Sequence, residues 1–480
     1  MTDKQASGGL VHHQSPDGES ELRDFLCAQL PIDCPQIRLV QNGTSNPRRL
    51  VGMGSLIVSP SDGVSARLTI RADPDHPHDA MAELQNNENL TPGQFAPDAF
   101  YYRLDATDVR GRVWQNDAVH VRLMSSDVDT LVVQIKCDFV ETRSPFAGRD
   151  HARLIFADDL QLPANRHSKS ERMVRGVRGM TMRLDHTGFR IDDTDVTYHR
   201  CAADPNGRSY EFTAAWPTGA AACYEFDQRL LEAIHFVTAS LALPVWSEVA
   251  HAGQFTVRVS KHRPTKAGLV RPPLNRVNDP DAIFALLRAY FEYACRDPVG
   301  GACAPATRII RSIIALDGAW LEAVALQICT AAEGLLNEPQ FKMLGAPGEA
   351  VVGEIDALRD HLESAPVRDT ALVTRARALL APMKSSSAKD RLHQLASQQV
   401  ISEAEIAAWN SLRHRAAHGT LRIDDAKLQP SLDSVYAVCA VIYKLTFLLI
   451  GYRGKYTNYG VRGWPTHNFC SDLTSHSRIP

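Results

Sequence analysis

The stretch RPTKAGLVRPPLNRVNDP, from Arg263 to Pro280, separates two halves of the chain whose hydrophobic residues recur with different periods. Proline, glycine and cationic residues are frequent in this stretch, and proline and glycine interrupt regular secondary structure. At 480 residues the chain is also too long for a single ordinary hydrophobic core. We therefore expect residues 263–280 to form a linker between two domains.

Before this stretch, short runs rich in β-branched and aromatic residues alternate apolar and polar positions, which is typical of half-buried strands. Turn residues separate the runs, and HTG (residues 186–188) has the composition of a hairpin tip. One amphipathic helix, in YEFDQRLLEAIHFVTASLAL from Tyr224 to Leu243, interrupts them. The pattern predicts a β-rich, sandwich-like or barrel-like domain over residues 46–262. Residues 1–45 are rich in Ser, Gly, Asp, Asn and Pro around one short helical patch, ELRDFLCAQL, from Glu21 to Leu30, and we expect a mostly flexible arm there.

After the stretch, apolar residues recur at helical spacing almost everywhere, which predicts an all-α bundle over residues 281–455. The fold class is therefore α+β multidomain, with the β-rich domain first. The most apolar segment, from Ser431 to Tyr452, is long enough to cross a membrane, but Lys444 falls near its middle. A buried bundle or interface helix explains that segment better than a membrane span. An aromatic and basic tail follows at residues 456–480.

Composition excludes several classes of function. The formal charge of −3 provides no global attraction to nucleic acid, so any phosphate binding has to come from local patches. The ten cysteines show no CxxC and no spacing typical of zinc, which suits reduced thiols in a cytoplasmic protein without a metal site. The polar N-terminus has no apolar signal-peptide region.

One predicted helix ends in an unusual concentration of cationic residues. SEAEIAAWNSLRHRAAHG, from Ser402 to Gly419, begins with a capping box of Ser402 and Glu405. His414 and His418 lie four residues apart and therefore share a face. Cations in a last helical turn are favourable with the helix dipole, so the charges could be explained by helix electrostatics alone.

The order of these residues also resembles a known signature. Arg413, a polar residue, three further residues and His418, near the end of a helix in an all-α domain, resemble the motif of HEPN domains. His414 stands at the polar position, and the following apolar helix agrees with the family pattern. The resemblance implies a metal-independent endoribonuclease with no cofactor, in which Arg413, His418 and His414 are the catalytic residues.

The chemistry suits these residue types. RNA carries its own nucleophile, the 2′-hydroxyl, and a His can move protons near neutral pH. An Arg offers two parallel hydrogen bonds to phosphate oxygens as their charge increases. The expected products are 2′,3′-cyclic phosphate and 5′-hydroxyl ends. Proteins with this motif usually place two copies in one cleft, so the resemblance implies a homodimer through this domain.

Other residues are candidates for supporting roles. Glu333 is acidic in an otherwise apolar helix; it could orient Arg413 or His414, or it could simply lie at a solvated edge. Arg415, three residues before His418, reaches the same face. The segment that contains Tyr452, Arg453, Lys455 and Tyr456 could contact RNA by stacking and charge, or its rings could pack back onto the bundle.

The domain order also resembles the ApeA-type proteins of bacterial anti-phage defence. That resemblance implies that the N-terminal domain responds to a phage-derived trigger and controls cleavage of RNA, such as tRNA, during abortive infection. The alternative is a non-catalytic HEPN-like module that binds RNA, a nucleotide or a protein. Under either hypothesis we expect a cytoplasmic protein without a membrane segment.

Overall fold

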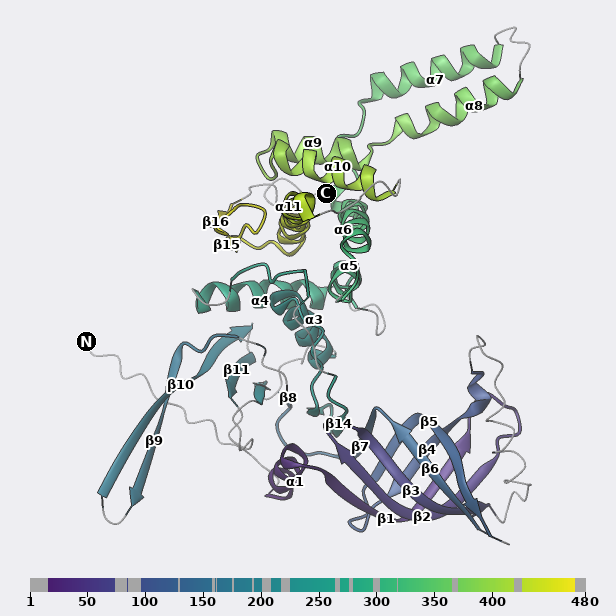
Figure 1. The fold of residues 1–480 in the computed structure, drawn as a ribbon, viewed down its shortest axis with the longest axis vertical. Coiled ribbons are helices and arrows are strands. Elements are labelled where there is room, and N and C mark those ends of the chain that lie inside the picture. The colour runs from purple at the N-terminus through teal and green to yellow at the C-terminus, as the bar shows by residue number, and fades with distance from the viewer. Residues whose placement is uncertain are drawn as a thin grey trace. The chain divides into compact units, whose positions relative to one another are not determined.

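A computed structural model describes residues 16–73, 84, 96–127, 130–157, 160, 162–174, 177–191, 194–200, 209–216, 225–263, 268–275, 279–296, 303–316, 318–364, 370–417 and 425–470. The chain divides into two compact units. The β unit comprises residues 1–160, 164–222 and 242–264, and the helical unit comprises residues 161–163, 223–241 and 265–480. The expected α+β organisation, with strands first and helices second, is confirmed (Figure 1).

The strands of the β unit form one antiparallel sheet in the order β4-β1-β2-β3-β6-β5-β7-β14-β13-β8-β12-β11-β10-β9. Because β4 also pairs with β5, strands β1 to β6 close into a six-stranded barrel, and the other strands continue from it as an open sheet. The barrel strands are β1 (Leu30–Gln41), β2 (Arg49–Ser59), β3 (Gly63–Ala72), β4 (Tyr101–Thr107), β5 (Val113–Ser126) and β6 (Leu131–Cys137). The open sheet contains β7 (Phe139–Pro145), β8 (His151–Phe156), β9 (Arg166–Val174), β10 (Val177–Ile191), β11 (Thr194–Arg200), β12 (Tyr210–Ala215), β13 (Trp246–His251) and β14 (Gln254–Ser260).

The expected hairpin tip at residues 186–188 is wrong. Strand β10 runs through these residues, and His186 and Gly188 lie opposite His199 and Thr197 of β11. A glycine in a strand provides no side chain to pack, but it does not by itself end the strand.

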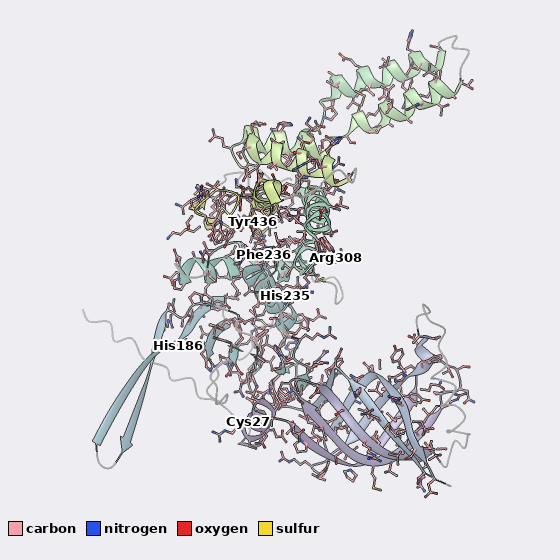
Figure 2. All side chains as sticks on the ribbon, in the orientation of Figure 1. Cys27, His186, His235, Phe236, Arg308 and Tyr436 are labelled. Carbon is pink, nitrogen blue, oxygen red and sulfur yellow. The ribbon has the colours of Figure 1, made fainter. Side chains whose placement is uncertain are left out.

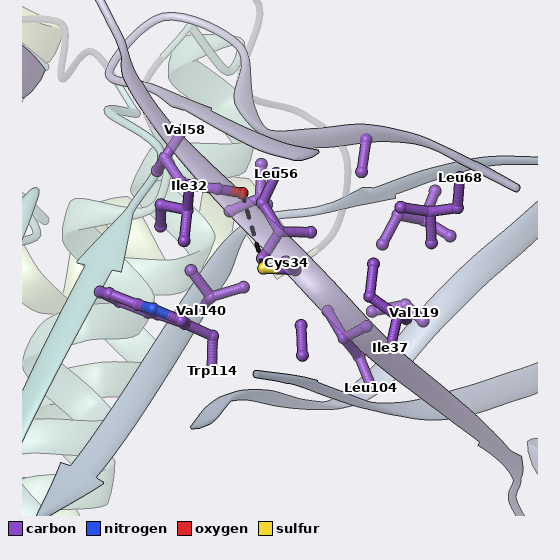
Figure 3. Packing of buried hydrophobic residues seen from close by; sticks show 14 of the residues in the cluster. Ile32, Cys34, Ile37, Leu56, Val58, Leu68, Leu104, Trp114, Val119 and Val140 are labelled. Carbon is purple, nitrogen blue, oxygen red and sulfur yellow. Dashed lines mark hydrogen bonds between the residues drawn. The ribbon is translucent and has the colours of Figure 1, made fainter. Parts of the chain in front are cut away.

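The prediction of a mostly flexible arm over residues 1–45 is wrong for residues 30–41, which form a strand, whereas the short helical patch expected from residue 21 does lie in a helix. Helix α1 (Pro16–Cys27) buries Leu22 and Phe25, and β1 is a central barrel strand. In β1 the alternation breaks at a bulge between Cys34 and Ile37, which hides the strand pattern from a simple period-two search. Figure 3 shows Cys34 inside the barrel core, where its thiol donates to the carbonyl oxygen of Ile32 at 3.5 Å.

The helical unit contains α3 (Phe226–Thr238), α4 (Pro280–Arg296), α5 (Pro305–Ile314), α6 (Leu321–Leu336), α7 (Glu349–Ser364), α8 (Thr370–Leu380), α9 (Ala388–Ser397), α10 (Glu403–Ala417) and α11 (Asp425–Ile450). A short hairpin, β15 (Gly454–Thr457) and β16 (Thr466–Phe469), follows α11. Helix α3 precedes β13 and β14 in sequence, yet it belongs to this unit. The expected domain boundaries therefore need correction at this helix.

Helix α3 provides part of the core of the helical unit. The ring of Phe236, labelled in Figure 2, stacks on that of Tyr290 with 4.6 Å between centroids. The buried Glu232 carboxylate accepts hydrogen bonds from the Ala304 amide at 3.1 Å and the Thr307 hydroxyl at 2.5 Å. These polar contacts join α3 to the start of α5.

Residues 263–280 also differ from a free linker, because their described part packs on the helical unit. Val270 and Leu274 are buried. The carbonyl oxygens of Arg271 and Pro273 accept hydrogen bonds from the Tyr443 hydroxyl and the Thr457 amide. The segment is therefore part of the helical unit from residue 265 onward.

Helix α11 crosses the core of the helical unit. Among the described residues it is the helix long and apolar enough to span a membrane, and 78% of that window is buried within the protein, as in the core helix of a soluble protein. Its Lys444 ammonium donates to both carboxylate oxygens of Glu405 on α10, at 2.8 and 2.9 Å. A buried cation is stable only when it is paired in this way. The helix begins at Asp425, ahead of Pro430, although we expected the apolar helix to begin after that proline.

Candidate functional site

The candidate site lies where the last turns of α10 pack beside the end of α6. Helix α10 begins with the predicted capping box. The Ser402 hydroxyl accepts from the Glu405 amide at 3.2 Å, and the Glu405 carboxylate accepts from the Ser402 amide at 2.7 Å. Trp409, one turn before the motif, is buried against α6, where its indole N–H donates to the Cys329 carbonyl oxygen at 3.5 Å. The start and the middle of α10 are thus fixed, and its cationic end is held against α6.

Arg413 and Glu333 form an ion pair between these two helices. The Arg413 Nε donates to Glu333 Oε1. The Arg413 guanidinium also lies over the Trp409 ring, 5.6 Å from its centroid, which is within the range of a cation–π contact. The side chain of Arg413 remains 53% exposed and that of Glu333 29% exposed. The pair is therefore at the surface, and the guanidinium is held in place while it stays accessible.

The structure agrees with both interpretations of Glu333 that the sequence left open. The Glu333 carboxylate pairs with Arg413, and its side chain is also partly solvated. Its charge is felt by Cys329, one turn earlier on α6. Burial and, to a smaller extent, the charge of the Glu333 carboxylate raise the pKa of the Cys329 thiol to about 12, although the charge of Arg413 lowers it. This thiol stays protonated and is not a nucleophile.

The other motif residues are described only in part. His414 is exposed on α10, at the position next to Arg413. Arg415 is half-buried, and its Nε donates to the carbonyl oxygen of Ser411, one turn earlier on the same helix, at 3.4 Å. His418 and Gly419 lie outside the described residues.

The segment after α11 packs on the bundle. Tyr452 and Tyr456 are buried, and their rings lie 5.0 and 6.0 Å from that of Phe447. The Lys455 ammonium pairs with Asp279 at 2.5 Å, and Arg453 is exposed. The packing interpretation therefore holds for the two tyrosines. Because these rings are buried, they are not available for stacking on bases. Tyr452 and Tyr456 are therefore packing residues of the bundle and no longer candidates for RNA contact.

One residue near the site has no recognisable sequence signal. Arg391 of α9 is buried, and it donates to the Leu336 carbonyl oxygen at 2.6 Å and to Asn337 Oδ1 at 3.0 Å. It thereby satisfies the C-terminus of α6, one turn beyond Glu333. In the sequence, Arg391 is one of several basic residues, and nothing there separates it from those on the surface.

The described residues contain no group of three or more His, Cys, Asp or Glu side chains placed to hold a metal ion. No protein-family model, curated protein or solved structure matches the chain.

Proposed function

We propose that the chain is a metal-independent endoribonuclease of the HEPN type. The observation that carries the proposal is the Arg413–Glu333 ion pair, which holds an accessible guanidinium near the end of a capped helix. Helix electrostatics alone explains a cation at this position, but it does not require an acidic partner on another helix.

In this proposal, Arg413 binds the non-bridging oxygens of the scissile phosphate. Its Nη groups are directed to the substrate while Nε stays on Glu333, because a guanidinium has five donors in a fixed fork. His418 takes the 2′-hydroxyl proton or gives a proton to the leaving 5′-oxygen. His414 is the second candidate for a proton-transfer role. The bond that forms joins the 2′-oxygen to phosphorus, and the bond to the 5′-oxygen breaks.

The proposed biological setting follows the resemblance to ApeA-type proteins. The β unit responds to a phage-derived trigger, and the helical unit then cleaves RNA, such as tRNA, as a homodimer in the cytoplasm. A nuclease without control would be toxic to its host, so a second unit with a regulatory role is physically reasonable.

The test uses the full-length protein and its His418→Ala and Arg413→Ala variants. Each is incubated in EDTA with cellular RNA and a lysate of phage-infected cells, which supplies the proposed trigger, and the ends of the fragments are analysed for 2′,3′-cyclic phosphate. The same lysate without the added protein gives the background. We expect both substitutions to abolish cleavage. Arg288→Ala is the matched control, because Arg288 is a comparably exposed arginine of α4 with an acidic neighbour, Glu292 at 3.7 Å. Full cleavage by His418→Ala would overturn the proposal.

Glu333→Gln tests the positioning role. The Arg413–Glu333 pair lies at the surface, where an ion pair contributes up to about 1 kcal/mol, so losing the charge of the carboxylate should lower kcat by roughly twofold to fivefold. Circular dichroism should be unchanged, because Glu333 is partly exposed. If wild-type protein binds RNA but produces no cyclic-phosphate ends, the non-catalytic binding module is the correct function.

A further inference from the structure

Helices α7 and α8 form a helical hairpin that buries very little of its own apolar surface. Among their residues only Ile355 and Leu380 are fully buried. Four large apolar side chains are instead exposed: Val351 48%, Leu358 48%, Leu372 60% and Leu379 66%. Exposed apolar side chains that cluster on one surface indicate a site of protein–protein contact.

These four side chains lie on one face of the hairpin. At 100° per residue, Val351 and Leu358 are rotated by about 40° and 60° from the buried Ile355, both in the same sense. Leu372 and Leu379 are rotated by about 80° and 100° from Leu380, again in that sense. In an antiparallel pair of helices, equal senses of rotation point to the same side. We call the side with Val351, Leu358, Leu372 and Leu379 the apolar face.

The ion pairs of the hairpin support this geometry, because they lie on the opposite side. Arg377 contacts Glu363 at 3.4 Å, and Lys384, just after α8, contacts Asp356. These residues are rotated from the buried positions in the other sense. The hairpin is therefore amphipathic as a whole, with cross-helix ion pairs on one side and exposed Leu and Val on the other. Figure 1 shows the two helices α7 and α8 side by side.

The two helices also carry opposite charges. Helix α7 has five acidic residues and one arginine, which gives −4. Helix α8 with the following turn has Arg375, Arg377 and Lys384, which gives +3. A surface with one acidic and one basic helix is self-complementary under a two-fold axis parallel to the helices. Each acidic helix then lies beside a basic helix of the other copy.

We propose that the apolar face binds the apolar face of a second copy of this chain, with α7 of one copy against α8 of the other. The four exposed apolar side chains of each copy then form the core of a four-helix bundle. In cross-section, negatively charged α7 and positively charged α8 helices alternate around this core. The other two-fold arrangement would place α7 beside α7 and α8 beside α8, and like charges disfavour it.

This surface is separate in sequence from the Arg413 motif. Where the inference concerns the nuclease, it rests on the proposed function: the hairpin would supply the second chain that a paired motif needs. The surface itself depends only on the apolar face and the charges of the two helices.

The test measures the mass of the full chain by light scattering at micromolar concentration, without RNA. We expect a dimer for the wild type and a monomer for Leu358→Glu/Leu379→Glu. The dissociation constant should rise by more than roughly a hundredfold, because each substitution occurs twice in a two-fold interface. The matched control is Met53→Glu, at a barrel position that is 61% exposed, which should remain a dimer. Circular dichroism verifies that each variant is folded.

A charge reversal beside the apolar face tests the arrangement. Glu354 is rotated by about 100° from Ile355 in the same sense as Val351 and Leu358, so Glu354→Lys should weaken the dimer if α7 lies beside α8 of the other copy; a stronger dimer would mean that like helices pair. A monomeric wild type, or a dimer that survives Leu358→Glu/Leu379→Glu, overturns the proposal. The two proposals fail in different ways: a dimer that never cleaves RNA refutes the ribonuclease and not this surface, whereas a monomer that cleaves RNA refutes this surface and the proposed homodimer but not the ribonuclease activity.

Discussion

The ion pair between Lys444 and Glu405 in the core of the helical unit gives the sharpest prediction of stability. Their side chains are only 9% and 8% exposed, and two hydrogen bonds join them. Lys444→Met keeps the length and apolar stem of the side chain but removes its charge. The Glu405 carboxylate then retains only its contacts with Ser402 and remains buried without a cation.

Removing one partner of a buried ion pair costs about 3–5 kcal/mol, because the other charge stays buried without compensation. We expect Lys444→Met to lower the free energy of unfolding by about 3 kcal/mol, the lower end of this range, because the Ser402 amide still donates to Glu405 at 2.7 Å. Glu405→Gln should cost as much or more, because it leaves the ammonium unpaired. The double variant should cost less than the sum of the two, since neither charge remains.

Urea denaturation followed by circular dichroism at 222 nm reports mainly on the helical unit. With a slope of about 1–3 kcal/mol per molar urea, a loss of 3 kcal/mol moves the midpoint by roughly 1 M or more. The matched control is Lys455→Met, because Lys455 pairs with Asp279 but is 50% exposed. It should cost less than about 1 kcal/mol. If Lys444→Met is no worse than this control, the assignment of the pair as a structural element is refuted.

Two predictions concern the β unit. Burial opposes ionisation of Glu211, but hydrogen bonding to His199 and the charge of Arg153 outweigh it and lower its pKa to about 2 from 4.5. The stabilisation that results from this lowered pKa is complete above pH 4.5 and is lost as the pH falls towards 2. It amounts to at most about 3 kcal/mol. Urea midpoints measured from pH 6 to pH 3 should therefore fall less steeply in Glu211→Gln than in the wild type. Trp114→Phe removes the indole hydrogen bond to Asp108 at 3.1 Å and should destabilise the barrel by about 1–3 kcal/mol, whereas an unchanged denaturation midpoint would contradict this role.

The sequence predicted the parts of the fold in which pattern and burial coincide. The change of period near residues 263–280 located the switch from strands to helices, and the capping box of Ser402 and Glu405 located the start of α10. Both are local signals. The closure of the barrel is not local, because β1 pairs with β4 and β3 pairs with β6, and these strands are far apart in the sequence.

The predictions failed where local composition and tertiary packing disagree. Residues 30–41 contain two prolines and a bulge, which weaken the strand signal, yet they pair on both sides in the barrel. Tyr452 and Tyr456 have the composition of an RNA-binding tail, but Phe447 provides an apolar surface for their rings. Composition cannot separate these outcomes, since both use aromatic residues beside cations.

For the candidate site, the sequence identified the helix and one correct contact. Glu333 was a candidate because an acidic residue in an apolar helix is unusual, and its pairing with Arg413 fits that reasoning. The buried anchor Arg391 was missed, because a structural arginine and a solvated one look alike until their neighbours are known. The roles in catalysis remain predictions for the experiments above.

The path of the chain through α3 has a genetic and practical consequence. The chain enters the helical unit for residues 223–241, returns to the β unit for β13 and β14, and leaves it again near residue 264. A fragment that begins at residue 265 would lack Phe236 and Glu232, and a fragment that ends there would carry an orphan helix. No single cut near residue 265 leaves α3 with the rest of the helical unit, so a fragment that keeps the core of this unit has to include residues 223–241. During synthesis, the helical unit also cannot be completed without a segment encoded within the β unit, which couples the production of the two from the same message.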